Sequence, residues 1–190
     1  MRRFLSVLGM AVCLFVVVGT AKASTFVVTF DDLSGDGVVP NGYGGINWNG
    51  NFTYYGEYQP PYTPESDPNR IYTPYSGAGE YDFNFLTPEV FDGAYFAGED
   101  FASVYFNLYN GASLVWTSAS LNPSATPTWL ASGYSGLVTG VGIYSADNDF
   151  YVADNVTYST TSTTPEPSSL LLFGTFLAGA FGAVRRKLRV

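Results

Sequence analysis

The chain has 190 residues, which is enough for one domain of ordinary size together with terminal targeting segments. It contains no histidine, and its single cysteine is Cys13, so Ser-His-Asp hydrolysis, His-assisted cysteine chemistry and the usual zinc sites are excluded. Arg70 is the only basic residue among residues 24–164, which carry fifteen carboxylates and a net charge of −14, and this balance excludes nucleic-acid binding.

The N-terminus predicts a secretory signal peptide over residues 1–23, and hence passage through the Sec export machinery. Two arginines precede a nearly continuous apolar run, and Ala21-Lys22-Ala23 then supplies the small-x-small pattern of a cleavage site. Cleavage between Ala23 and Ser24 removes Cys13, so the mature domain has no disulfide. An uncleaved N-terminal anchor is the alternative, although the apolar run is short and the cleavage pattern follows it at the right distance.

Residues 24–158 consist of short β-type runs separated by Gly, Pro, Asn and Asp, and no window has a helical period. Val104, Phe106 and Leu108 alternate with polar neighbours, as in a strand with one buried face. The pattern therefore predicts an all-β domain, an antiparallel β-sandwich of jelly-roll type. The expected strands are Thr25–Phe30, Ile46–Trp48, Phe52–Tyr55, Tyr81–Phe85, Ala94–Ala97, Ser103–Tyr109, Ser113–Thr117, Leu137–Tyr144 and Phe150–Tyr158.

The domain resembles jelly-roll and galactose-binding-like sandwiches. The residues that carry the resemblance are TFDDL at 29–33, GYGGINW at 42–48 and FYVADNVT at 150–157. The resemblance implies that the first and last strands pair with each other. It does not extend to residues 56–79.

Asp32 and Asp154 are candidate ligands of a structural calcium ion. Period two places Asp154 on one face of the last strand together with the apolar residues Phe150, Val152, Val156 and Tyr158. The same alternation, continued from Phe26, Val28 and Phe30, points Asp32 inward. A carboxylate on an apolar face must be paired, hydrogen-bonded or metal-bound, and cationic side chains are scarce here.

The resemblance also implies calcium, because related carbohydrate-binding sandwiches often carry a structural calcium ion near these strands. The alternative is that Asp154 accepts backbone N–H bonds in a turn. Asp147-Asn148-Asp149 is expected to form a turn, since no calcium-loop spacing continues from it.

Residues 52–75 contain seven aromatic residues and five prolines. Proline-stiffened loops that display tyrosines can stack on sugar rings while nearby Asn, Asp and Glu bind the hydroxyl groups. We therefore expect Tyr54, Tyr55, Tyr58 and Tyr62 to contact carbohydrate, although these rings could instead cover the open end of the sandwich. The tryptophans Trp48, Trp116 and Trp129 are expected in the core or at sheet edges.

Catalysis is not expected. Carboxylate pairs such as Glu57 with Glu65, or Glu99 with Asp100, could in principle supply the two acids of a glycosidase. However, closeness along a loop says nothing about separation across a cleft, and an acidic domain offers many such pairs by chance. The sequence contains no Gly-rich phosphate loop, nucleophile elbow or metalloprotease motif.

A Ser/Thr linker over residues 159–164 leads into a C-terminal segment, residues 165–190, with three parts in order. Pro165-Glu166-Pro167 comes first, and residues 168–184 follow without a charge. As a helix this run would span roughly 25 Å at about 1.5 Å per residue, just enough for a bilayer core. The tail 185–190 would stay in the cytoplasm, held by the basic residues Arg185, Arg186, Lys187 and Arg189.

This arrangement resembles the PEP-CTERM sorting signal of Gram-negative bacteria. The resemblance implies that an exosortase-type membrane protease cuts at the motif, so that the protein is anchored in the inner membrane only transiently. The released protein then reaches the cell surface or extracellular matrix, in bacteria that generally also make exopolysaccharide. A permanent tail anchor is the alternative.

Sandwiches of this kind are common among PEP-CTERM proteins. The expected function is therefore a surface protein that associates with exopolysaccharide through a non-catalytic, carbohydrate-binding-like sandwich. Two alternatives stay open: a purely structural, self-associating surface protein, and a carboxylate-dependent polysaccharide-modifying enzyme.

Overall fold

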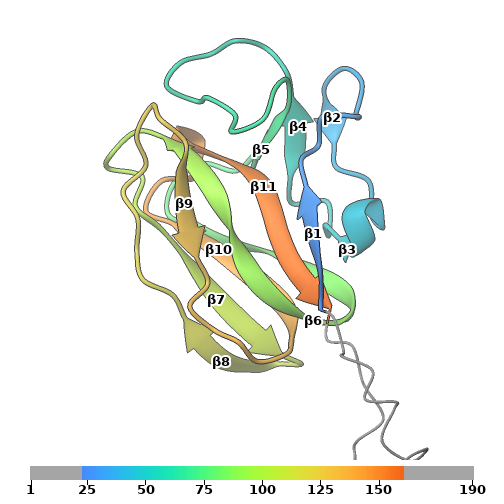
Figure 1. Ribbon diagram of the computed structural model, residues 1–190. Helices are drawn as coiled ribbons and strands as arrows, with labels where there is room; N and C mark the ends of the chain where they lie inside the picture. The colour runs from blue at the N-terminus through green and yellow to red at the C-terminus, as the bar shows by residue number, and fades with distance from the viewer. Residues whose placement is uncertain (1–22, 161–190) are drawn as a thin grey trace, which may run out of the picture. The chain divides into compact units, whose positions relative to one another are not determined.

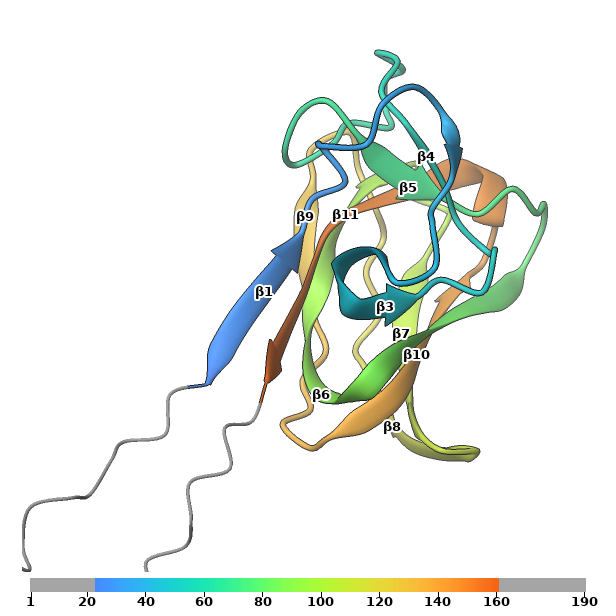
Figure 2. The ribbon, with the colours of Figure 1, turned by 90° about the vertical axis from the view of Figure 1, so that its right-hand side faces the viewer.

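The described part of the chain forms a single antiparallel β-sandwich. The computed structural model describes residues 23–160, and the predicted signal peptide and C-terminal sorting segment lie outside them. Within these residues all regular structure is β, apart from two short 3-10 turns, which confirms the predicted all-β antiparallel class. No helix within residues 23–160 is long and apolar enough to cross a membrane. The strands lie in two layers, sheet A and sheet B (Figures 1 and 2).

Sheet A brings together the two ends of the described chain. Strand β1 (Ser24–Val28) pairs antiparallel with β11 (Tyr151–Thr160), which confirms the expected pairing of first and last strands. Beside the same edge of β11 lies β5 (Arg70–Tyr72), followed outward by β4 (Thr53–Tyr55) and β2 (Gly37–Val38). The other edge of β11 pairs with the second half of β6 (Gly79–Gly98), and β9 (Thr128–Ala131) pairs beyond it.

Sheet B is built on the first half of β6, so this one strand belongs to both layers. The order is β3 (Ile46–Asn47), β6, β10 (Val138–Ser145), β7 (Val104–Asn110) and β8 (Ser113–Thr117). Residues 86–88 of β6 are exposed and stand between the two paired halves. The strand bends as it passes from one sheet to the other (Figure 2).

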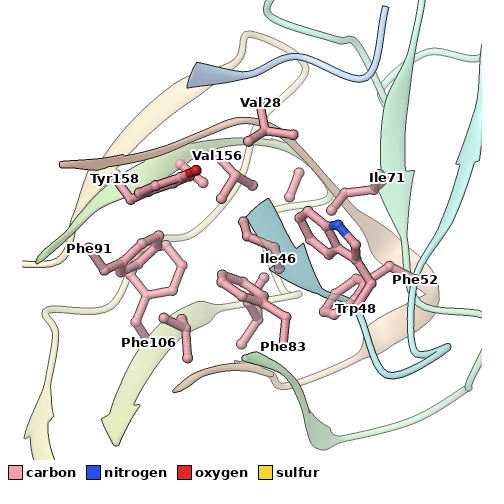
Figure 3. Close-up of a cluster of buried hydrophobic side chains, with 14 of the residues drawn as sticks. Val28, Ile46, Trp48, Phe52, Ile71, Phe83, Phe91, Phe106, Val156 and Tyr158 are labelled. Carbon is pink, nitrogen blue, oxygen red and sulfur yellow. The ribbon is translucent and has the colours of Figure 1, made fainter. Parts of the chain in front are cut away.

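The core between the sheets is rich in aromatic residues (Figure 3). The Phe83 ring centroid lies 5.1 Å from that of Trp48 and 6.0 Å from that of Phe91, which packs edge-on against Phe106 at 4.8 Å. In β7, buried and half-buried residues alternate as predicted. The tryptophans divide between core and edge: Trp48 is fully buried, whereas the other two lie partly exposed on β8 and β9.

A β-bulge at Asn155 determines which side chains of β11 face the core. Asn155 has a φ of 50°, and the ladder with β6 contains one extra residue of β11 between Asp154 and Thr157. The core cluster contains Ala153, Val156 and Tyr158 but not Val152, so Asp154, two residues after Val152, faces away from that cluster. The expectation that Asp154 shares a face with Val156 and Tyr158 is therefore wrong, because a strict period of two does not survive an extra residue.

Asp154 instead anchors the proline loop, residues 56–69, which connects β4 with β5. The Asp154 side chain is buried, and its Oδ2 accepts the backbone N–H groups of Glu65 and Ser66, both at 2.8 Å. At the end of the loop, Asn69 donates through Nδ2 to the carbonyl oxygens of Phe30 (2.7 Å) and Leu33 (2.8 Å). The loop is thereby fixed in its middle and at its end.

Burial raises the pKa of the Asp154 carboxyl from 3.8 to about 7. The backbone N–H bonds from Ser66, Asn155 and Glu65 act in the opposite direction, and the nearby charge of Asp31 raises the pKa further. Because the pKa of the folded state exceeds that of the unfolded chain, the folded protein binds more protons between these two values. Stability from this group is therefore complete below pH 3.8 and declines as the pH rises towards 7.

We predict that the unfolding free energy of the wild type falls between about pH 4 and about pH 7, with a slope from Asp154 approaching roughly 1.4 kcal/mol per pH unit. Asp154→Asn mimics the protonated carboxyl and keeps an oxygen for the two loop N–H groups, so it should remove this component. Urea unfolding at several pH values measures both slopes. Identical slopes in the two proteins would show that Asp154 titrates normally.

Candidate functional site

A pocket of about 360 Å³ lies between the proline loop and sheet A. Four tyrosines and several polar side chains line it. We call it the tyrosine pocket, and its lining residues are Asp36, Thr53, Tyr55, Gln59, Tyr62, Tyr72, Asp149, Tyr151 and Val152.

Two of the tyrosines are fixed by the pairing of β4 with β5. Thr53 lies opposite Tyr72 and Tyr55 opposite Arg70, so alternate residues of both strands face the pocket side of the sheet. The rings of Tyr55 and Tyr72 meet edge to face, with centroids 5.3 Å apart.

Arg70, the cross-strand partner of Tyr55, supports this arrangement from the same face of the sheet. Its side chain is 1% exposed, and its guanidinium carbon lies 3.8 Å from the centroid of the Tyr55 ring. Such a cation–π contact is stronger when the cation is desolvated, as it is here. Arg70 also donates through Nη2 to the carbonyl oxygen of Glu57 in the proline loop. One buried cation thus positions both a pocket ring and the start of the loop.

The hydroxyls of Tyr55, Tyr62 and Tyr151 stay protonated at neutral pH. Burial raises the pKa of Tyr55, and burial together with nearby carboxylates such as Glu99 raises that of Tyr62. Burial also raises the pKa of Tyr151, whose hydroxyl has no hydrogen-bond partner within residues 23–160. The Tyr55 and Tyr62 hydroxyls therefore offer both a donor and an acceptor to a polar ligand, whereas the Tyr151 hydroxyl is buried.

Acceptors come from two carboxylates and an amide. The 3-10 turn Asn148–Phe150 places Asp149, and the preceding Asp147 accepts the Asp149 N–H at 3.4 Å, which confirms the turn expected at this position. Asp36 approaches from the loop before β2, and Gln59 from the proline loop. The pocket therefore combines aromatic rings with neutral and anionic polar groups.

The structure separates the four tyrosines that were expected to bind carbohydrate. Tyr55 and Tyr62 line the tyrosine pocket together. Tyr54 packs against the core and donates its hydroxyl to the carbonyl oxygen of Ser34 at 3.2 Å. Tyr58 is 89% exposed and lies outside the pocket.

Sequence reasoning did not assign Tyr72, Gln59 or Asp149 to the site. Tyr72 was visible as part of the aromatic run 52–75, but nothing in the sequence showed that it pairs beside Thr53. Asp149 comes from a turn almost eighty residues further along the chain, and only the tertiary fold brings it to the pocket.

The two candidate calcium ligands have different surroundings. Asp32 is exposed, because Phe30, with a φ of 64°, ends the alternation of β1, so the expectation that Asp32 points inward is wrong. Its Oδ1 accepts the hydroxyl of Tyr43. The Asp154 oxygens already accept three backbone N–H groups, and residues 23–160 contain no cluster of three or more carboxylates suited to a metal ion. The donor set fits calcium poorly, and calcium binding stays a prediction that thermal unfolding with and without chelator would test.

The carboxylate pairs considered for catalysis do not meet in the tyrosine pocket. None of Glu57, Glu65, Glu99 and Asp100 is among its lining residues, although Glu99 lies close enough to influence Tyr62. The pocket's own carboxylates are Asp36 and Asp149, which come from separate loops.

Comparisons with known proteins give one distant likeness. No protein-family model matches the chain, and no curated protein matches it. Among solved structures, a mutant of a family 29 carbohydrate-binding module is similar, with 14% identity and a TM-score of 0.43. The similarity covers 77% of this chain and 99% of that module, and it is too distant to transfer a ligand or a site.

Proposed function

We propose that the sandwich is a non-catalytic glycan-binding domain and that the tyrosine pocket is its binding site. The observation that carries this proposal is the grouping of Tyr55, Tyr62 and Tyr72 with Gln59 and Asp149 around one cavity. Aromatic faces pack against the C–H surfaces of sugar rings, and amide and carboxylate groups bind the ring hydroxyls. A volume of about 360 Å³ suits one or a few sugar units.

The charge of the domain disfavours anionic polymers as ligands of the tyrosine pocket and favours neutral ones. Residues 24–160 carry fifteen carboxylates and one basic side chain, Arg70, which is buried beneath Tyr55. A uronate-rich or phosphorylated polymer would meet Asp36 and Asp149 without an accessible cation to receive its charge. Neutral hexose polymers avoid this repulsion and still supply the hydroxyl donors that carboxylates bind.

The terminal segments support a proposal about where this binding takes place. The predicted signal peptide implies export through the Sec machinery, and Pro165-Glu166-Pro167 with its apolar run and basic tail implies sorting by an exosortase-type protease. The jelly-roll-like domain would then associate with exopolysaccharide at the cell surface or in the extracellular matrix of a Gram-negative bacterium. Glycan binding within the sandwich does not depend on this sorting step.

A second candidate function is self-association through the edge of sheet B. Strand β8 pairs with β7 along one side, and Leu114 and Trp116 on it are 54% and 42% exposed. Exposed apolar edge strands favour pairing with another copy. If this edge associates, light scattering should show mass rising with concentration, and Leu114→Lys should suppress the rise. A concentration-independent monomer mass would exclude this function.

For the tyrosine pocket, we predict that Tyr62→Ala weakens binding of a neutral glycan about tenfold, or roughly 1.4 kcal/mol, because it removes a wall of the cavity. Tyr58→Ala is the matched control, since Tyr58 lies on the same loop but outside the pocket. Binding to the host's exopolysaccharide and to a panel of neutral oligosaccharides would be measured by affinity electrophoresis. Equal losses in both variants, or no binding by the wild type, would count against the pocket.

For sorting, we predict that mass spectrometry of the mature protein from its host finds Ser24 at the N-terminus and a C-terminus within residues 165–167. The physical reason is that the apolar run 168–184 holds the chain at the protease until cleavage. A mature mass that still includes residues 168–190 would favour the permanent tail anchor.

A further inference from the structure

The outer face of sheet B carries a second, separate cavity over Gly140 of β10, and the Glu80 side chain covers the neighbouring Gly142. In the sheet register, Gly140 stands between Asn84 of β6 and Tyr109 of β7. Gly142, two residues further along β10 and on the same face of the sheet, stands between Asp82 and Asn107. Polar side chains on two strands therefore face each other across a central strand that presents no side chain at these two positions.

This arrangement leaves a trough of about 290 Å³, which we call the glycine trough. Glu80, Asp82 and Asn84 line one side, Tyr109 and Ala112 the other, and Gly140 the floor. A side chain at either glycine would displace a polar neighbour: a Cβ at Gly140 would lie 2.7 Å from Asn84 Oδ1, and one at Gly142 would lie 2.1 Å from Glu80 Oε1.

The hydrogen bonds around the trough leave acceptors in excess. Glu80 Oε1 accepts the hydroxyl of Tyr109 at 2.7 Å, and Oε2 accepts the Nδ2 group of Asn107. Asp82 accepts the Nδ2 groups of Asn49 (2.9 Å) and Asn51 (3.1 Å). The neighbouring amide donors are thus directed to the two carboxylates, each of which keeps further lone pairs for a ligand.

No cationic side chain neutralises these two carboxylates. Arg70 is the only basic residue within residues 23–160, and its guanidinium lies over Tyr55 in sheet A. The bond to Glu80 raises the pKa of Tyr109 to about 12, so its hydroxyl remains a donor to the carboxylate. The trough therefore presents negative charge and acceptor lone pairs beside an aromatic ring.

We propose that the glycine trough binds the amino sugar of a cationic glycan, such as a glucosamine unit with a free amine. The ammonium group is placed against Glu80 and Asp82, where charge-assisted hydrogen bonds are strongest. Neighbouring sugar hydroxyls donate to the Asn84 carboxamide oxygen, and the ring packs against Tyr109. This site is distinct from the tyrosine pocket and does not require it.

The absence, within residues 23–160, of a cationic side chain beside Glu80 and Asp82 determines which ligand the trough binds. An N-acetylated sugar loses the ammonium charge and therefore the charge-assisted bonds to Glu80 and Asp82. A plain glucose unit fits but offers no charge to Glu80 and Asp82. A lysine side chain of another protein carries the ammonium but not the hydroxyls beside it, so it engages only the carboxylates.

The test titrates the full-length protein with three short oligosaccharides that differ only at the second carbon of each unit: glucosamine, N-acetylglucosamine and glucose oligomers. We expect the glucosamine oligomer to bind about tenfold more tightly than either of the others, with an affinity that falls as salt is added. Equal affinity for all three oligomers would overturn the proposal. A lysine oligomer of equal length that binds as tightly, and with the same dependence on Glu80, would also overturn it by assigning the trough to protein ligands.

Two variants separate the trough from general attraction to an acidic protein. Glu80→Gln removes one charge in the trough and should abolish the preference for glucosamine, whereas Asp100→Asn removes one charge from an exposed turn and should not. Gly140→Ala keeps every carboxylate and partly fills the floor, and it should weaken binding without unfolding the strand, because only the end of the Asn84 side chain must move. Equal losses in the Glu80 and Asp100 variants would contradict a defined site.

The tyrosine pocket provides an independent control. Tyr62→Ala should leave glucosamine binding unchanged, because Tyr62 belongs to the proline loop beside sheet A. Loss of neutral-glycan binding in this variant with retained glucosamine binding would show two sites. Loss of both in Tyr62→Ala would overturn the separate trough.

Discussion

The bond between Asp154 and the proline loop is the contact on which the tyrosine pocket depends. The loop contains four prolines, which supply no N–H groups, so it cannot join a sheet through a regular ladder. Asp154 replaces that ladder with one buried carboxylate that accepts the N–H groups of Glu65 and Ser66. The anchored loop then holds Gln59 and Tyr62 over the strands of sheet A. The cost is a carboxyl group in a desolvated position, which is why its pKa is raised.

The strands with strong periodicity were predictable, and the strands held only by tertiary pairing were not. The alternation in β7 and the pairing of β1 with β11 follow from the sequence and from the resemblance it carries. Strand β6 was expected as two shorter strands, Tyr81–Phe85 and Ala94–Ala97. Its two halves pair with β10 and β11, which lie far along the chain, and no local pattern indicates that pairing. The strands β2, β5 and β9 have two to four residues, and so short a segment has no period to detect.

The segment of the chain that forms most of the candidate site was predicted correctly, but only some of the residues that line it were. Tyr54 and Tyr55 are neighbours in β4, and since successive residues of a strand point to opposite faces, they could not both enter one pocket. The orientation of Asp154 depends on the bulge at Asn155, and asparagine is one of the few non-glycine residues that readily adopts a positive φ. An asparagine within a strand marks a position where the alternation of inward and outward side chains can break. Its presence alone does not show that a break occurs.

Both proposed sites depend on the same imbalance of charge. The domain has one basic side chain, and that side chain is buried beneath a tyrosine, so every accessible charged group within residues 24–160 is an acid. In the tyrosine pocket, aromatic rings and acceptor groups favour ligands with hydroxyl groups. In the glycine trough, Glu80 and Asp82 lie close together, and this pair of carboxylates adds a preference for an ammonium group. Because the tyrosine pocket belongs to sheet A and the glycine trough to sheet B, a ligand in one does not occupy the other. A protein that fills both can hold two polymer chains at once, which raises its retention in a matrix beyond the affinity of either site.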